Sequence, residues 1–234
     1  METAPRRRPI DRVVATAVAA VASGGIVGAL ALAHAATPLI ARRDPAAARD
    51  VITLMRASEH ATYVDEVSFT RVDPDGRRVS AQEFAARAPG TLVTRSGSNL
   101  NIVLHGTATD CALVADRPSC MQKSAPSGLP ESEVLRVAVD AGIYDVMRAP
   151  SAVIAGERAR CFAIRAHVLN KQLPNDFGAE SDLCFASDGV PLRNRRYSDR
   201  LDDWETTRVS RTFDATTLAP VLVGFDRTAP RVAG

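Results

Sequence analysis

The chain has 234 residues, which is enough for one domain of ordinary size and an appendage. Its net charge of +2 is unevenly distributed along the chain. Residues 1–43 carry six arginines and two acidic residues, a net charge of +4, so residues 44–234 have a net charge of −2. A nearly neutral domain lacks the clustered basic face that nucleic acids require, so no nucleic-acid partner is expected.

The N-terminal segment is apolar between two groups of arginines. Residues 13–35 hold no charged side chain and are long enough to cross the ~30 Å hydrocarbon core of a membrane as a helix. Arginines are more numerous before this segment than after it, which predicts a cytoplasmic N-terminus and an exported remainder. The sequence Ala33-His34-Ala35 also fits the end of a cleaved signal peptide, and a buried helix of a soluble protein is the third alternative.

The first two alternatives place the rest of the chain outside the cytoplasm. It is then either held at the cell membrane by one span or, after cleavage behind Ala35, secreted or periplasmic. The expected parts are a cytoplasmic N-terminus (1–12), an anchor or signal segment (13–35), a linker (36–45), an extracytoplasmic α+β domain (46–225) and a tail (226–234).

The expected domain begins with helical periodicity and then changes to strand periodicity. Asp44 can cap a helix that starts at Pro45 and ends near His60. From Tyr63 onward, apolar and polar residues alternate, which predicts a strand. Residues 80–88 are expected to form a short helix or an irregular segment, and strands are expected at 91–95, 100–105 and 110–115.

A second helix is expected to start near Pro130 and to end at Gly142. Glu131 and Glu133 favour the positive end of its dipole, and glycine commonly ends helices. Strands are then expected at 143–147, 151–154, 160–168, around Cys184 and at 205–213, followed by a short strand or helix from Thr216.

The four cysteines are Cys111, Cys120, Cys161 and Cys184, and they allow three disulfide connectivities. None forms a C-x-x-C motif, so neither a zinc knuckle nor a thioredoxin-like site is indicated. An exported domain could form disulfides. Four free buried thiols are the alternative.

Strand geometry selects one pairing of the cysteines. If the strands around Cys161 and Cys184 pair antiparallel with these residues opposite, Phe162 faces Leu183 and Arg165 faces the acidic residue at position 180. Apolar side chains then meet apolar ones and opposite charges pair. The sequence therefore predicts a disulfide between these two cysteines, with the other two closing a second, shorter hairpin.

Two late features lead to further expectations. The dipeptide Asp188-Gly189 predicts a tight hairpin turn, which would place Phe185 opposite Leu192. A mixed-charge cluster is expected to form a solvated loop, with a functional site as the alternative, and Trp204 within it either packs at the rim of the core or contacts a partner. The cluster consists of Asp199, Asp202, Asp203 and Glu205, interleaved with Arg195, Arg196, Arg200 and Arg208.

Catalytic and metal-binding signals are sparse. The four histidines lack metal-ligand spacing, and neither a nucleophile elbow nor a nucleotide-binding motif occurs. The turn at Asp73–Gly76 resembles the start of a calcium loop, but its twelfth residue is Phe84 instead of glutamate. We therefore expect no catalytic residue, no metal and no cofactor. An enzyme would need His105 or His167 beside a serine and an acid.

The order of elements resembles a known superfamily. The helix-to-strand entry "LMRASEHATYVDEVSF", the long antiparallel sheet, the mid-chain helix and the late strands carrying "CFASDGVPLR" are similar to the LolA/RseB-like half-barrels of bacterial lipoprotein and lipid carriers and related envelope sensor domains. The resemblance covers about residues 46–225. It implies a curved sheet closed by helices around an apolar cavity for acyl chains. This chain lacks the lipobox cysteine of the mycobacterial members.

The preferred hypothesis is a membrane-anchored, non-enzymatic domain that binds a lipid or a lipidated ligand. A sheet with one apolar face needs a helical cover, and a loose cover leaves a cavity. The alternative is an interaction domain or envelope-stress sensor with a filled core, an exposed apolar patch and an envelope protein as partner. The residues expected to line the cavity are Val67, Phe69, Phe162, Ile164, Phe185 and Leu192.

Overall fold

The computed structural model describes residues 44–124, 128–167 and 177–225. The expected cytoplasmic segment, the anchor or signal segment and the tail lie outside the described residues. Within the described part of the chain, no helix is long and apolar enough to cross a membrane.

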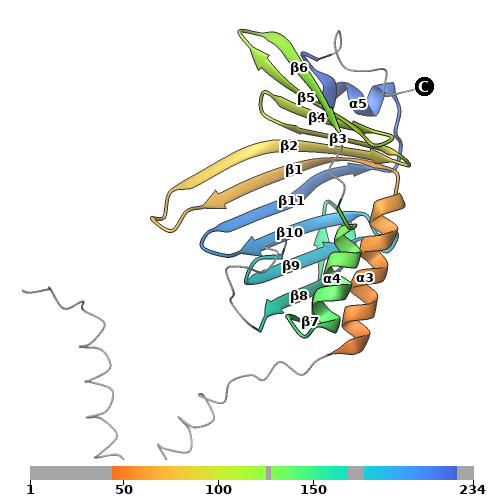
Figure 1. Ribbon diagram of the computed structural model, residues 1–234, viewed down its shortest axis with the longest axis vertical. Coiled ribbons are helices and arrows are strands. Elements are labelled where there is room, and N and C mark those ends of the chain that lie inside the picture. The colour runs from red at the N-terminus through yellow and green to blue at the C-terminus, as the bar shows by residue number, and fades with distance from the viewer. Residues whose placement is uncertain (1–43, 125–127, 168–176, 226–234) are drawn as a thin grey trace, which may run out of the picture. The chain divides into compact units, whose positions relative to one another are not determined.

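The described domain contains three helices and one open, antiparallel sheet of eleven strands (Figure 1). The strand order is β6-β5-β4-β3-β2-β1-β11-β10-β9-β8-β7. The helices are α3 (Pro45–His60), α4 (Glu131–Asp140) and α5 (Ala215–Leu222). The strands are β1 (Tyr63–Val72), β2 (Arg78–Ala88), β3 (Thr91–Ser96), β4 (Asn99–Leu104), β5 (Thr107–Val114), β6 (Arg117–Ser124), β7 (Tyr144–Ile154), β8 (Glu157–Ala166), β9 (Glu180–Phe185), β10 (Pro191–Tyr197) and β11 (Leu201–Ser210). The expected α+β class with a long antiparallel sheet is confirmed.

Helices α3 and α4 form where the sequence predicts them. The Asp44 carboxylate accepts hydrogen bonds from the backbone N–H groups of Ala46 and Ala47 and so caps α3. Proline at the first helical position lacks an N–H group that would have no partner there. The apolar stripe of α3 is buried and packs, together with α4, mainly against β7 (Figure 1).

The strand register defines the two faces of the sheet. Directly paired residues of antiparallel strands share a face, and here one row crosses five neighbouring strands. We call the face that carries this row the helical face, because α3 and α4 cover its first two members. From β8 through β9, β10 and β11 to β1, the row is Phe162, Leu183, Asn194, Trp204 and Phe69.

Helix α5 covers the opposite face of the sheet at its other end. Its buried residues Leu218 and Val221 pack with Ala86, Val93 and Leu100 of β2, β3 and β4. Ala86 is five positions along β2 from the partner of Phe69, and an odd separation places it on the other face. The helices therefore cover different faces at the two ends of the sheet.

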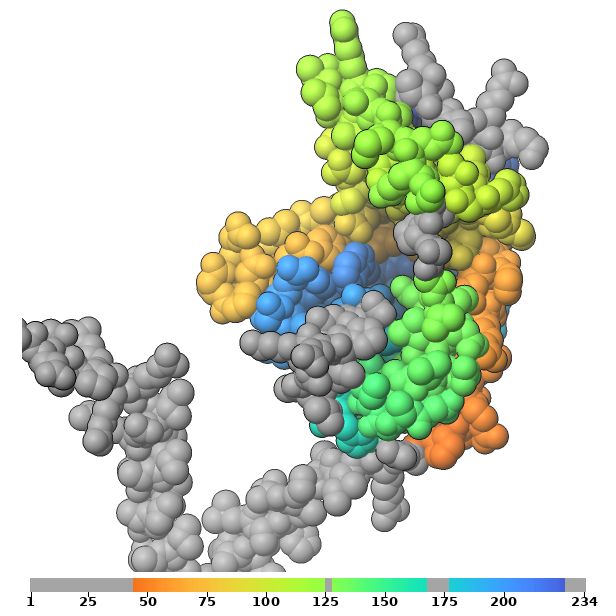
Figure 2. Space-filling model, viewed as in Figure 1, coloured from red at the N-terminus to blue at the C-terminus, as the bar shows by residue number. Residues whose placement is uncertain are grey.

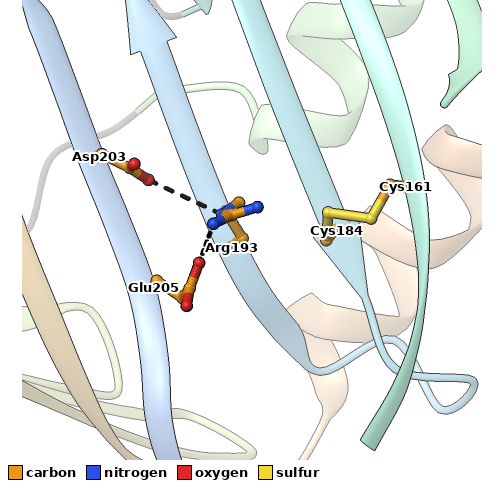
Figure 3. Close-up of a disulfide and its surroundings, with 5 residues drawn as sticks. All are labelled: Cys161, Cys184, Arg193, Asp203 and Glu205. Carbon is orange, nitrogen blue, oxygen red and sulfur yellow. Dashed lines mark ion pairs between the residues drawn. A yellow bond between two sulfur atoms is a disulfide. The ribbon is translucent and has the colours of Figure 1, made fainter. Parts of the chain in front are cut away.

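Both predicted disulfides are present. Cys111 pairs with Cys120 across β5 and β6, and Cys161 pairs with Cys184 across β8 and β9. The predicted register is also confirmed, because Arg165 lies opposite Glu180 and their charged groups are 2.6 Å apart. Figure 3 shows the second disulfide beside Arg193, which forms ion pairs with Asp203 and Glu205.

Three local expectations are wrong. Residues 80–88 belong to β2, because pairing with both β1 and β3 overrides the helical propensity of an alanine-rich segment. The segment 199–208 is largely strand β11, whose charges pair with those of neighbouring strands. Leu192 does not face Phe185, because a bulge in β10 places Pro191 there.

Removing the disulfides should cost stability in proportion to the loops that they close. The sequence separations are 9 and 23 residues. Loop-closure entropy then predicts losses of about 2.7 and about 3.4 kcal/mol for the Cys→Ala pairs at Cys111–Cys120 and Cys161–Cys184. Urea unfolding of the two double variants measures both losses, and a larger loss for the shorter loop would contradict the entropic account.

Candidate functional site

An aromatic pair lies at the middle of the helical face. The ring centroids of Phe69 and Trp204 are 5.0 Å apart with the planes tilted by 32°. The Arg71 guanidinium lies 5.3 Å from the centroid of the Phe69 ring. The indole Nε1 of Trp204 donates a hydrogen bond to Glu83 Oε2 at 3.1 Å. The only polar atom of the Trp204 side chain therefore has a partner, and the rest of the indole ring is an apolar surface.

The main helix contacts lie outside the strands that carry this pair, although Phe69 itself is only 8% exposed. Helices α3 and α4 pack chiefly on β7, whereas α5 packs on β2 and β3. Figure 2 shows β10 and β11 at the floor of a recess between the β1–β2 hairpin and α4. We call this the central recess. By strand register, its floor consists of Val67, Phe69, Asn194 and Trp204.

A charged cluster closes one end of the floor. The Asp202 carboxylate accepts hydrogen bonds from Arg71 Nε at 2.6 Å and from Arg200 Nε at 3.1 Å. Partial burial works against ionisation of Asp202, but these two guanidinium groups outweigh it and hold the pKa of Asp202 below its ordinary value. The cluster fixes Arg71 over the Phe69 ring, so it positions the aromatic floor.

The helical face becomes polar beyond the aromatic pair. Ser96 Oγ donates to Glu83 Oε1 at 2.8 Å and links the floor to a hollow of about 500 Å³ over β3–β6. This hollow is lined partly by Thr94, Asn101 and Asp110. None of the six predicted cavity residues lines it. The face is therefore apolar at the α3 and α4 end and polar at the β6 end.

The structure separates the six predicted cavity residues into three groups. Val67 and Phe69 lie on the floor of the central recess. Phe162, Ile164 and Phe185 are 5% exposed or less and belong to a packed core with α3 and α4. Leu192 packs instead with both cysteines of the second disulfide. Whether any of these residues contacts a ligand stays a prediction.

An enzyme would need a histidine beside a serine and an acid, and this arrangement is present only in part. His167 Nε2 lies 2.6 Å from Asp145 Oδ2, so a histidine and an acid are together. Among the described residues, no serine, threonine or cysteine is hydrogen-bonded to His167. Within the same residues, no group of three or more His, Cys, Asp or Glu side chains could hold a metal ion.

No protein-family model matches this chain, and no curated protein matches it either. Solved structures do match. A structure of MucB is 14% identical over 72% of this chain, with a TM-score of 0.45, and the match spans 60% of the MucB chain. LprF from Mycobacterium bovis is 10% identical over 74% of this chain and 96% of its own, with a TM-score of 0.42.

A LolA-superfamily protein from Nitrosomonas europaea also matches, at 6% identity over 72% of this chain and 96% of its own, with a TM-score of 0.32. The similarity to all three structures is at low identity and at TM-scores below 0.5.

Sequence reasoning included Val67 and Phe69 among the cavity residues but missed Asn194 and Trp204. Trp204 lies among charged residues, and only the alternation Asp202-Trp204-Thr206 on one face of a strand could have indicated its position. Glu83 gave no signal, because β2 lies near Trp204 only through the long-range pairing of β1 with β11. Asn194 gave no signal because its position opposite Trp204 depends on the β10–β11 register.

Proposed function

We propose that the domain is a non-enzymatic binding domain that takes a lipid or a lipidated ligand in the central recess. The observation that carries this proposal is the Phe69–Trp204 pair, which lies on the helical face outside the main helix contacts. A mostly apolar floor with a few polar groups is the usual chemistry of such sites, and Asn194 Oδ1 on this floor has no hydrogen-bond partner within the described residues.

The two disulfides support a location outside the cytoplasm. All four cysteines are paired, and disulfides persist in oxidising compartments. A domain held at a membrane there would act as a fixed lipid receptor or sensor, whereas a released one would act as a carrier.

A filled-core interaction domain is the second candidate. The packing of Phe162, Ile164 and Phe185 with α3 and α4 favours it, because that half of the helical face is occupied by protein side chains. On this account the recess would receive an apolar side chain of a partner protein.

Ligand binding can be tested with the single tryptophan of the chain. We expect energy transfer from Trp204 to cis-parinaric acid, a fluorescent fatty acid, in the wild-type protein. Val67→Glu should weaken binding at least about tenfold, because it places a charge on the apolar floor. Val153→Glu is the matched control, since Val153 is 75% exposed on β7.

Native mass spectrometry of the purified protein separates the two candidates. A discrete mass of one lipid per chain, absent in Val67→Glu, is expected if the recess binds lipid. A chain that stays free of ligand after incubation with membrane lipids would refute lipid binding and favour the interaction domain.

A further inference from the structure

One carboxylate is buried at the end of the central recess. Asp65 alternates with Val67 and Phe69 along β1 and so lies on the helical face. Its side chain is 5% exposed, and its Oδ1 atom has no hydrogen-bond partner within the described residues. Burial raises the pKa of Asp65 to about 7, although the Thr206 hydroxyl and the backbone N–H of Ala85 offset part of that effect.

Thr206 connects this carboxylate to a third strand. Its hydroxyl lies 3.4 Å from Asp65 Oδ2 on β1 and 3.4 Å from the carbonyl oxygen of Pro191 on β10. Thr206 is itself 4% exposed, so water does not readily replace either contact. A hydroxyl has one proton to donate, and the hydrogen bond to Asp65 therefore competes with the one to Pro191.

The regular pairing of β11 with both of its neighbours is interrupted or ends beside Thr206. The β1–β11 register shifts between Glu66 and Val67, next to Asp65, and the β10–β11 register ends at Arg193 opposite Glu205, before Pro191 and Thr206. A bulge interrupts the ladder of backbone hydrogen bonds. Side-chain contacts such as those of Thr206 consequently have a larger share in holding β10 against β11 at this point.

We propose that Asp65, Thr206 and the Pro191 carbonyl form a proton-dependent switch between β1, β11 and β10. When Asp65 is protonated, it donates to Thr206 Oγ1, and the hydroxyl proton is free to bond Pro191. When Asp65 is ionised, the hydroxyl donates to the carboxylate, and the contact with Pro191 is lost. The switch does not require that the recess bind any ligand.

Nearby charges influence the switch without forming a bond to Asp65. The Arg211 guanidinium favours the ionised form of Asp65 from the end of the sheet, but it is bound to Asp188 and Glu157. Burial and the Asp65 carboxylate together raise the pKa of Tyr63. The other groups that act on Tyr63 are Arg87 of β2 and Glu131 of α4.

Trp204 is a natural reporter, because it lies two residues from Thr206 on β11 and is the only tryptophan in the chain. We expect the fluorescence of the full-length protein to change with a midpoint at about pH 7. Asp65→Asn should remove this change and keep the low-pH signal, because the amide can donate to Thr206 as the protonated acid does. Asp182→Asn, on β9, is the control and should titrate like the wild type.

A second variant tests the relay directly. In Thr206→Val, the Asp65 carboxyl should still titrate by carbon-13 NMR, whereas Trp204 should no longer respond. A transition that survives in Asp65→Asn would overturn the proposal, because a group other than Asp65 would then cause it. A wild-type response of Trp204 in Thr206→Val, or a carboxyl of Asp65 that titrates near its ordinary value, would overturn it as well.

Discussion

Asp65→Asn should stabilise the protein at about pH 8 by roughly 4 kcal/mol. The pKa of Asp65 is about 7 in the folded state and 3.8 in the reference state. The unfolded chain therefore loses this proton first as pH rises. The penalty on folding grows between about pH 4 and about pH 7 and is constant above that range, because the carboxylate must then be buried in its charged form.

Urea unfolding of the wild type and Asp65→Asn across this pH range checks the prediction. The difference in the free energy of unfolding should be small at about pH 4 and should increase as pH rises. Other carboxylates, such as Asp202, titrate equally in both proteins, so their effects cancel. A difference that does not depend on pH would show that the substitution acts through packing alone.

Phe162→Ala should destabilise the protein by about 3–5 kcal/mol, with little direct effect on ligand binding. The Phe162 side chain is 1% exposed and packs beneath α3 and α4, so truncation leaves a cavity in a filled core. Thermal or urea unfolding measures the loss, and Val153→Ala at an exposed position of β7 is the control. The control should change stability by less than about 0.5 kcal/mol.

The same variant distinguishes a core from a binding pocket. If Phe162 lined a lipid cavity, its truncation would enlarge that cavity and change lipid affinity more than stability. If Phe162→Ala folds with nearly wild-type stability but binds parinaric acid differently, Phe162 belongs to the ligand site and not to the core.

The sequence was sufficient for elements that local patterns determine. The cap of α3 by Asp44, the β8–β9 register and the pairing of the cysteines follow from neighbouring residues and one hairpin. The position of Leu192 did not follow, because the bulge at Pro191 depends on contacts with β9 and β11. The recess could not be predicted for the same reason: Phe69 and Trp204 are 135 positions apart and meet only through the β1–β11 pairing.

The order of the strands has a consequence for how the chain folds. Every neighbouring pair in the sheet is consecutive in sequence except β1 with β11. Two meanders, β1–β6 and β7–β11, can thus assemble from local hairpins with little loss of loop entropy. Formation of the long-range pairing between β1 and β11 should be the slow step of folding. The bulge between Glu66 and Val67 lies in this pairing. Substitutions at the bulge should therefore change the folding rate more than substitutions within either meander.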